Sequence, residues 1–227
     1  MPQRALIEQR PWLVASLVAG IGYYFISASA VPDLYEWAMK GAGAAFLAVY
    51  ALVRHPGRDA KQIAAVMALG ALGDVLIELD LIWGALAFLV GHMIAIALYW
   101  RHRRETVSAS QTALAFAMLA FIPLIAFVLP ADRSAAPGVA LYAFGLAAMA
   151  ASAWTSNFPR YRVGIGAVMF VISDLLIFSR MGPLANSAVP GLLIWPLYYI
   201  GQFLICTGVI GEMRQRAPAT NGRSRAL

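Results

Sequence analysis

The sequence predicts an all-α protein that crosses a membrane eight times. Of its 227 residues, 61% are hydrophobic and 12% are charged, whereas soluble domains have about 45–50% and about 25%. The apolar residues form blocks close to the length of roughly 20 residues that a membrane-spanning helix needs. These blocks lack the two-residue alternation of a membrane β-barrel. We therefore expect a polytopic helical membrane protein.

Each expected helix is one of these apolar blocks. They cover residues 12–30, 35–53, 63–79, 81–100, 112–129, 138–154, 163–179 and 192–210. The connections are short and carry turn-forming residues, in the order VPD, HPG, PAD, NFP and GP. We expect a single transmembrane domain over residues 1–213 and a basic, disordered cytoplasmic tail over residues 214–227.

The start of the chain has an alternative interpretation. Arg4 and Arg10 precede an apolar run that ends in SASA, a pattern similar to a cleaved signal peptide. The run is long for a signal peptide, and its removal would leave seven spans with the two termini on opposite sides. We therefore expect the first block to remain as a spanning helix.

The basic residues predict the orientation. With eight spans, one side of the membrane receives both termini and the loops after spans two, four and six. That side holds Arg4, Arg10, Arg54, Arg58, Lys61, Arg101, Arg103, Arg104, Arg160, Arg162, Arg214, Arg216, Arg223 and Arg225. The other side holds Arg133 and Arg180. The positive-inside rule predicts a protein of the cell inner membrane with both termini in the cytoplasm, and it explains the net charge of +6 without nucleic-acid binding.

Two aspartates are the main functional signal. Asp74 lies in the third block, within GDVLI, and Asp174 lies in the seventh, within SDLLI. A carboxylate in a membrane-spanning segment is costly, and therefore indicates function unless a structural role explains it. The matching local sequences also predict two four-helix repeats in parallel orientation, which would bring both aspartates to the same depth.

Other polar residues are expected at a similar depth. In the predicted topology they lie in the middle or outer half of the membrane, and they are Lys40, Glu78, His92, Tyr198, Tyr199 and Gln202. Asp74 and Glu78 are four residues apart and share a helix face. Glu36 and Lys40 have the same spacing, which allows an ion pair. We interpret the set as the lining of one polar chamber within the membrane.

Several other interpretations compete with a catalytic chamber. The polar groups would also form a purely structural network, with Asp74 bonded to His92 and Asp174 to Tyr199 or Gln202. A proton-coupled transporter or lipid carrier would use the same acids as a relay. Metal binding by these acids and His92 lacks a recognised ligand spacing, so we expect no metal or cofactor. Ser173 favours an interhelical hydrogen bond, and Cys206 favours a core position.

Four motifs in order resemble the YhhN/TMEM86 family of lysoplasmalogenases. They are GDVL at 73–76, GALAFLVGH at 84–92, FVISD at 170–174 and YYIGQ at 198–202. The resemblance covers most of the chain, although Gly41 follows Lys40 where the family pattern has proline. It implies hydrolysis of the vinyl-ether bond of a lysophospholipid, the lysoplasmalogen, to a fatty aldehyde and a glycerophospho-ethanolamine or -choline.

The predicted chamber is compatible with that chemistry. Vinyl ethers hydrolyse by protonation at carbon, followed by attack of water on an oxocarbenium-like cation. This requires a proton donor and a carboxylate. Two carboxyl groups in one site can divide these roles, so we assign Asp74 and Asp174 as the catalytic pair without deciding which is the acid. His92, Tyr199 and Gln202 would orient reacting groups, and Lys40 would meet the phosphate.

Overall fold

The computed structural model describes residues 10–27, 29 and 31–216, and this part of the chain is helical without strands. It contains eight α-helices and one π-helical turn. Their bounds are α1 (Arg10–Ile26), α2 (Asp33–Arg54), α3 (Arg58–Leu79), α4 (Leu81–Arg101), α5 (Ala109–Val128), α6 (Ala136–Thr155), η2 (Arg160–Gly164), α7 (Ile165–Arg180) and α8 (Val189–Arg216).

The helices confirm the predicted all-α membrane fold. Within the described part of the chain, six helical segments are long and apolar enough to cross a membrane, namely α3, α4, α5, α6, α8 and the continuous η2–α7 segment. The apolar helix α1 is shorter, and α2 has 22 residues with charged side chains near both ends. The large apolar side chains that remain exposed along the helices, such as Phe25, Phe116 and Leu141, are those expected of a surface in contact with lipid.

The boundaries differ from the expected ones at both ends of the chain. Helix α1 ends at Ile26, before the predicted limit of 30, which is outside the described residues. Helix α8 continues to Arg216, so residues 214–216 of the predicted tail are helical. The guanidinium of Arg216 lies 2.9 Å from the Glu212 carboxylate four residues earlier, and such pairs stabilise an exposed helical turn. Arg4 and residues 217–227 also lie outside the described part.

A single residue separates α3 from α4. Asp80 adopts an extended conformation, and its carboxylate accepts hydrogen bonds from the backbone nitrogens of Ile82 at 2.8 Å and Trp83 at 3.2 Å. A side-chain acceptor at this position satisfies the free N–H groups of a helix start. Asp80 therefore caps α4 at the surface, whereas Asp74, six residues earlier, is buried.

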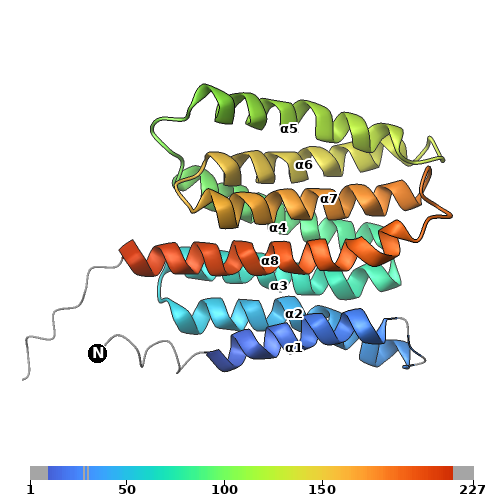
Figure 1. Ribbon diagram of the computed structural model, residues 1–227, viewed down its shortest axis with the longest axis horizontal. Coiled ribbons are helices and arrows are strands. Elements are labelled where there is room, and N and C mark those ends of the chain that lie inside the picture. Colours follow the sequence, from blue (N-terminus) through green and yellow to red (C-terminus); the bar gives the residue numbers. More distant parts are fainter. Residues whose placement is uncertain (1–9, 28, 30, 217–227) are drawn as a thin grey trace, which may run out of the picture.

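Consecutive helices run antiparallel to one another along the horizontal axis of Figure 1, so the molecule has two distinct ends. The terminal end holds Arg10, Arg216 and the loops that precede α3, α5 and η2. The Asp80 end holds the loops that precede α2, α4, α6 and α8. The cationic loop residues predicted for one side of the membrane, where described, lie at the terminal end.

The packing agrees in part with the predicted repeat. If residues of α1–α4 correspond to those of α5–α8, α2 is equivalent to α6 and α4 to α8. Helix α4 packs on α6 and α8 packs on α2, as this equivalence requires. Helix α8 also packs on α3, whereas the reciprocal contact of α4 with α7 is slight at most. The two halves are therefore related only approximately.

Candidate functional site

The first buried carboxyl group belongs to Asp74 on α3. Asp74 is 2% exposed, and its Oδ2 accepts a hydrogen bond of 2.8 Å from the hydroxyl of Tyr198 on α8. The amide of Gln202, one turn later on α8, donates to the same hydroxyl at 3.4 Å. Asp74 therefore pairs with Tyr198 across the contact between α3 and α8, rather than with His92, the partner suggested for a structural network.

Two glycines on α3 lie against neighbouring helices, Gly70 against α8 and Gly73 against α4. A Cβ atom at Gly70 would lie 2.9 Å from Nε2 of Gln202, and one at Gly73 would lie 2.8 Å from the ring of Phe88. Both separations are shorter than those that Cβ atoms make with neighbouring atoms in proteins. Glycine at these positions lets the neighbouring helices approach closely, and this approach places their polar and aromatic side chains next to Asp74.

The second buried carboxyl group belongs to Asp174 on α7. Asp174 is 5% exposed, and its Oδ2 accepts a hydrogen bond of 2.7 Å from the hydroxyl of Tyr142 on α6. The same hydroxyl lies 3.3 Å from Nε2 of His92 on α4. Ser173 donates to the carbonyl of Ile194 on α8 at 2.9 Å, so it forms the expected interhelical hydrogen bond.

Aromatic rings connect the two carboxyl groups. The ring of Phe170 lies 5.2 Å from the ring of Tyr198 and 5.2 Å from that of His92. Phe88 completes the group, with its ring 5.7 Å from Tyr198 and 5.8 Å from Phe170. Each carboxyl group thus has its own tyrosine donor, and both tyrosines belong to one continuous set of packed rings.

We call these polar residues and the rings between them the carboxyl–tyrosine cluster. It consists of Asp74, Phe88, His92, Tyr142, Phe170, Asp174, Tyr198 and Gln202. Five elements contribute to it, α3, α4, α6, α7 and α8, so both halves of the chain are required. Within the described residues, no three His, Cys, Asp or Glu side chains form a group able to hold a metal ion.

Lys40 and Glu78 form an ion pair between α2 and α3 near the Asp80 end. Their side chains are 14% and 31% exposed, respectively. Lys40 therefore pairs with Glu78 rather than with Glu36, the partner suggested by helical spacing. Since Glu78 lies one turn after Asp74, the pair is next to the cluster and closer to the surface.

Tyr199 lies apart from the carboxyl groups. Its hydroxyl is 2.9 Å from that of Ser16 on α1, and its ring stacks on Trp195 with 5.9 Å between centroids. Adjacent residues on a helix project in different directions, so Tyr198 reaches α3 while Tyr199 reaches α1. Asp174 therefore does not pair with Tyr199 or Gln202, the partners suggested for a structural network, and the tyrosine bonded to Asp174 is Tyr142.

Sequence reasoning did not identify Tyr142. It lies within the apolar segment ALYAFGLAA, where one hydroxyl is a weak signal. A tyrosine hydroxyl buried in an apolar helix normally finds a hydrogen-bond partner. This rule could have indicated that Tyr142 bonds to a polar group on another helix. The sequence did not reveal that this partner is on α7.

An apolar groove opens beside this cluster at the Asp80 end. It has a volume of about 390 Å³, and its walls include Leu81, Ala85 and Leu86 of α4, Val139 and Tyr142 of α6, and Phe178 of α7. A second, smaller cavity of about 30 Å³ reaches Asp174. The two share Leu81, Ala85, Tyr142 and Phe178 as lining residues. We call the first space the α4–α6 groove.

These features define a polytopic helical membrane protein with two buried, tyrosine-bonded carboxyl groups, one of which, Asp174, lines a cavity next to an apolar groove. A family model of the YhhN family matches residues 35–209. The chain belongs to this family.

Two relatives carry the name lysoplasmalogenase. One is from Mycobacterium bovis (strain ATCC BAA-935 / AF2122/97) and the other from Mycobacterium tuberculosis (strain CDC 1551 / Oshkosh). Each is 30% identical over 181 residues, covering 75% of this chain and 69% of the relative. No solved structure matches the chain.

Proposed function

We propose that this protein is a lysoplasmalogenase-like hydrolase, which cleaves the vinyl-ether bond of a lysoplasmalogen. The observation that carries the proposal is the α4–α6 groove, whose lining residues Ala85 and Tyr142 also line the cavity at Asp174. An apolar groove of this kind suits the hydrocarbon chain of a lipid. A carboxyl group next to the groove is positioned to act on the vinyl-ether bond at the end of that hydrocarbon chain. Family membership and the names of the two relatives support the same activity.

Asp174 is the proposed proton donor because a cavity reaches it. Tyr142 donates to Oδ2, which leaves Oδ1 to carry the transferable proton. Asp174 protonates the vinyl carbon remote from oxygen and becomes a carboxylate. Water then attacks the cationic carbon attached to oxygen and returns a proton to Asp174. The resulting hemiacetal breaks its bond to the glycerol oxygen, which yields the aldehyde and the glycerol hydroxyl.

Asp74 is the proposed second carboxyl group, acting as an anion that stabilises the positive charge formed by protonation. Preorganised charges and dipoles are effective in a site that excludes water. Tyr198 and Gln202 hold Asp74 in position, and His92 positions Tyr142. Lys40 is the proposed partner of the substrate phosphate, for which it would exchange its contact with Glu78.

We also propose that both termini lie in the cytoplasm and that the protein resides in the cell inner membrane. The excess of arginine and lysine at the terminal end supports this orientation. The cluster and the α4–α6 groove would then lie in the outer half of the bilayer, where a lysolipid can enter sideways between α4 and α6.

The proposal is tested with purified protein and three matched lysolipids, which carry a vinyl-ether, a saturated alkyl-ether or an acyl chain. Aldehyde release from the vinyl ether alone is the expected result. Asp74→Asn and Asp174→Asn should each abolish turnover while the protein remains folded and monodisperse. Equal cleavage of the acyl lipid would disprove the assignment, and substantial activity in both variants would disprove the acid-pair mechanism.

A further inference from the structure

A separate pocket lies at the terminal end, away from the carboxyl–tyrosine cluster. It has a volume of about 260 Å³ and is formed where α4, α5 and α6 meet the loop after α4. Its apolar wall includes Trp100 of α4 and Ala115, Phe116 and Leu119 of α5. Trp100 and Phe116 are 64% and 69% exposed, so this wall adjoins the surface expected to face lipid.

A polar pocket adjoins this apolar one. It has a volume of about 480 Å³ and is lined by Arg103, Arg104, Glu105, Thr106 and Asn157. Arg103 and Arg104 line both pockets. The combined space therefore has an apolar part between helices and a cationic part at the helix ends. We call it the interfacial pocket.

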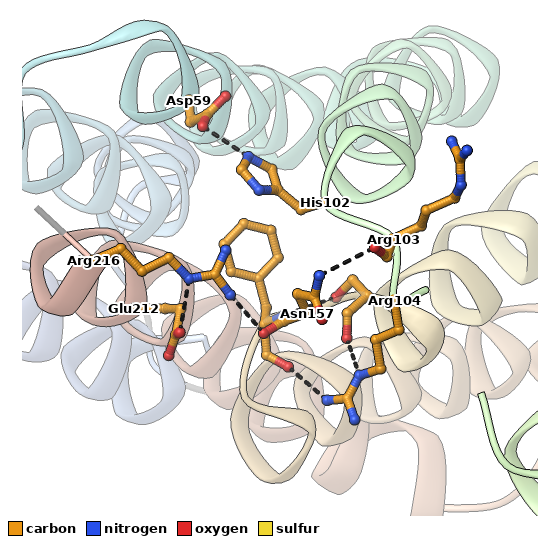
Figure 2. A network of polar contacts seen from close by, with 9 residues as sticks. Asp59, His102, Arg103, Arg104, Asn157, Glu212 and Arg216 are labelled. Carbon is orange, nitrogen blue, oxygen red and sulfur yellow. Dashed lines mark hydrogen bonds and ion pairs between the residues drawn. The ribbon is translucent and has the colours of Figure 1, made fainter. Parts of the chain in front are cut away.

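The two arginines differ in how they are held. Arg104 donates from Nε to the Ser156 carbonyl at 2.7 Å and from Nη2 to the Phe158 carbonyl at 3.5 Å. The guanidinium of Arg103 lies 5.7 Å from the Trp100 ring and makes no hydrogen bond or ion pair with the described residues. Figure 2 shows the Arg103 side chain extending away from the polar network around it.

The local charge favours an anion. Burial and the neighbouring Arg160 guanidinium lower the pKa of Arg104 below its usual range, so cations repel each other here. Glu105 is the acid that lines the polar pocket, and it is exposed. The nearby acids Asp59 and Glu212 already have cationic partners, which are Arg101 for Asp59 and Arg216 for Glu212.

We propose that the interfacial pocket binds an anionic phospholipid, with its phosphate at Arg103 and Arg104 and one acyl chain between α4 and α5. Arginine recognises phosphate through paired N–H donors, and basic groups at the ends of spanning helices attract anionic lipid headgroups. The apolar part of the pocket would hold the acyl chain, and the cationic part would hold the phosphate. It lies at the opposite end of α4 from the groove that begins at Leu81, so this lipid is distinct from the proposed substrate.

The experiment measures lipid binding by native mass spectrometry and by thermal unfolding in detergent. The wild-type protein is titrated with phosphatidylglycerol, phosphatidylcholine and inorganic phosphate. We expect phosphatidylglycerol to bind and raise the unfolding temperature, and phosphatidylcholine and inorganic phosphate to have little effect. Arg103→Gln should weaken phosphatidylglycerol binding about fivefold, which corresponds to the ~1 kcal/mol that one basic residue contributes near anionic lipid.

One further variant tests the contribution of the acyl chain, and another is a control for the loss of positive charge outside the pocket. Ala115→Phe should weaken phosphatidylglycerol binding by filling the apolar part of the pocket while both arginines remain. Arg58→Gln removes a cation from the same end, outside the pocket, and should leave binding unchanged. The proposal is wrong if Arg58→Gln weakens binding as much as Arg103→Gln, if neither pocket variant changes it, or if inorganic phosphate binds as tightly as the lipid.

Discussion

The pairing of Tyr142 with Asp174 leads to the most discriminating prediction. Replacing Tyr142 by phenylalanine removes the donor that lies 2.7 Å from the Asp174 carboxyl and 3.3 Å from His92. A hydrogen bond to a charged group contributes about 1.5–3 kcal/mol. If the full amount acts in the transition state, Tyr142→Phe should lower kcat by about 10- to 150-fold.

Tyr199→Phe is the matched control. It also removes a buried tyrosine hydroxyl, one that lies 2.9 Å from the Ser16 hydroxyl and stands apart from both carboxyl groups. Both variants should lose a similar amount of stability, about 1–3 kcal/mol for a buried group left without its partner. Only Tyr142→Phe should lose activity.

The assay compares kcat for aldehyde release with the unfolding temperature of each variant in the same detergent. Activity measured well below both unfolding temperatures separates a positioning effect from a loss of folded protein. The reasoning would be refuted if Tyr142→Phe kept nearly the wild-type kcat, or if Tyr199→Phe lost as much activity as Tyr142→Phe.

Three further predictions concern the surroundings of the cluster. Gly73→Ala should lower both activity and unfolding temperature because the added Cβ would overlap an aromatic ring. Gly91→Ala is the control and should change neither strongly, because the nearest atom lies 3.6 Å from the added Cβ. Equal losses in the two variants would contradict the packing argument. Ala85→Trp should block the α4–α6 groove and raise KM or abolish turnover in a folded protein. Ala113→Trp, at an exposed position, should be close to wild type. Unchanged kinetics in Ala85→Trp would exclude the groove as the binding site of the lipid's hydrocarbon chain. Lys40→Met should raise KM for a lysolipid but not for the alkenyl glycerol that lacks phosphate, and a similar rise for both would remove Lys40 from headgroup binding.

The arrangement of spans was predictable because it depends on local composition. The expected helix over 35–53 corresponds to Asp33–Arg54, and the one over 81–100 to Leu81–Arg101. A segment within the membrane must satisfy its own backbone hydrogen bonds, which it does by forming a helix. An apolar segment of spanning length therefore predicts a helix. The end of α8 was misplaced because a helix that leaves the membrane no longer needs apolar residues.

The partners of the buried acids were only partly predictable. The sequence predicted that both acids share one polar chamber, because they lie at a similar depth in the expected topology. The pairs suggested for a structural network were Asp74 with His92 and Asp174 with Tyr199 or Gln202. Depth alone does not decide which helix faces which, so the predicted set contained Tyr199 and omitted Tyr142. The rotation of each helix depends on close packing at glycine and alanine positions on neighbouring helices.

The sequence by itself determined the class of protein, the approximate spans and the two acids within apolar segments. Each of these follows from the cost of placing charge in hydrocarbon, which is a property of a single segment. Only the tertiary structure decided that Tyr142 bonds to Asp174, that Lys40 pairs with Glu78, and that a groove between α4 and α6 adjoins the cavity at Asp174. Those contacts join residues distant in the chain, and they depend on how the described helices pack together.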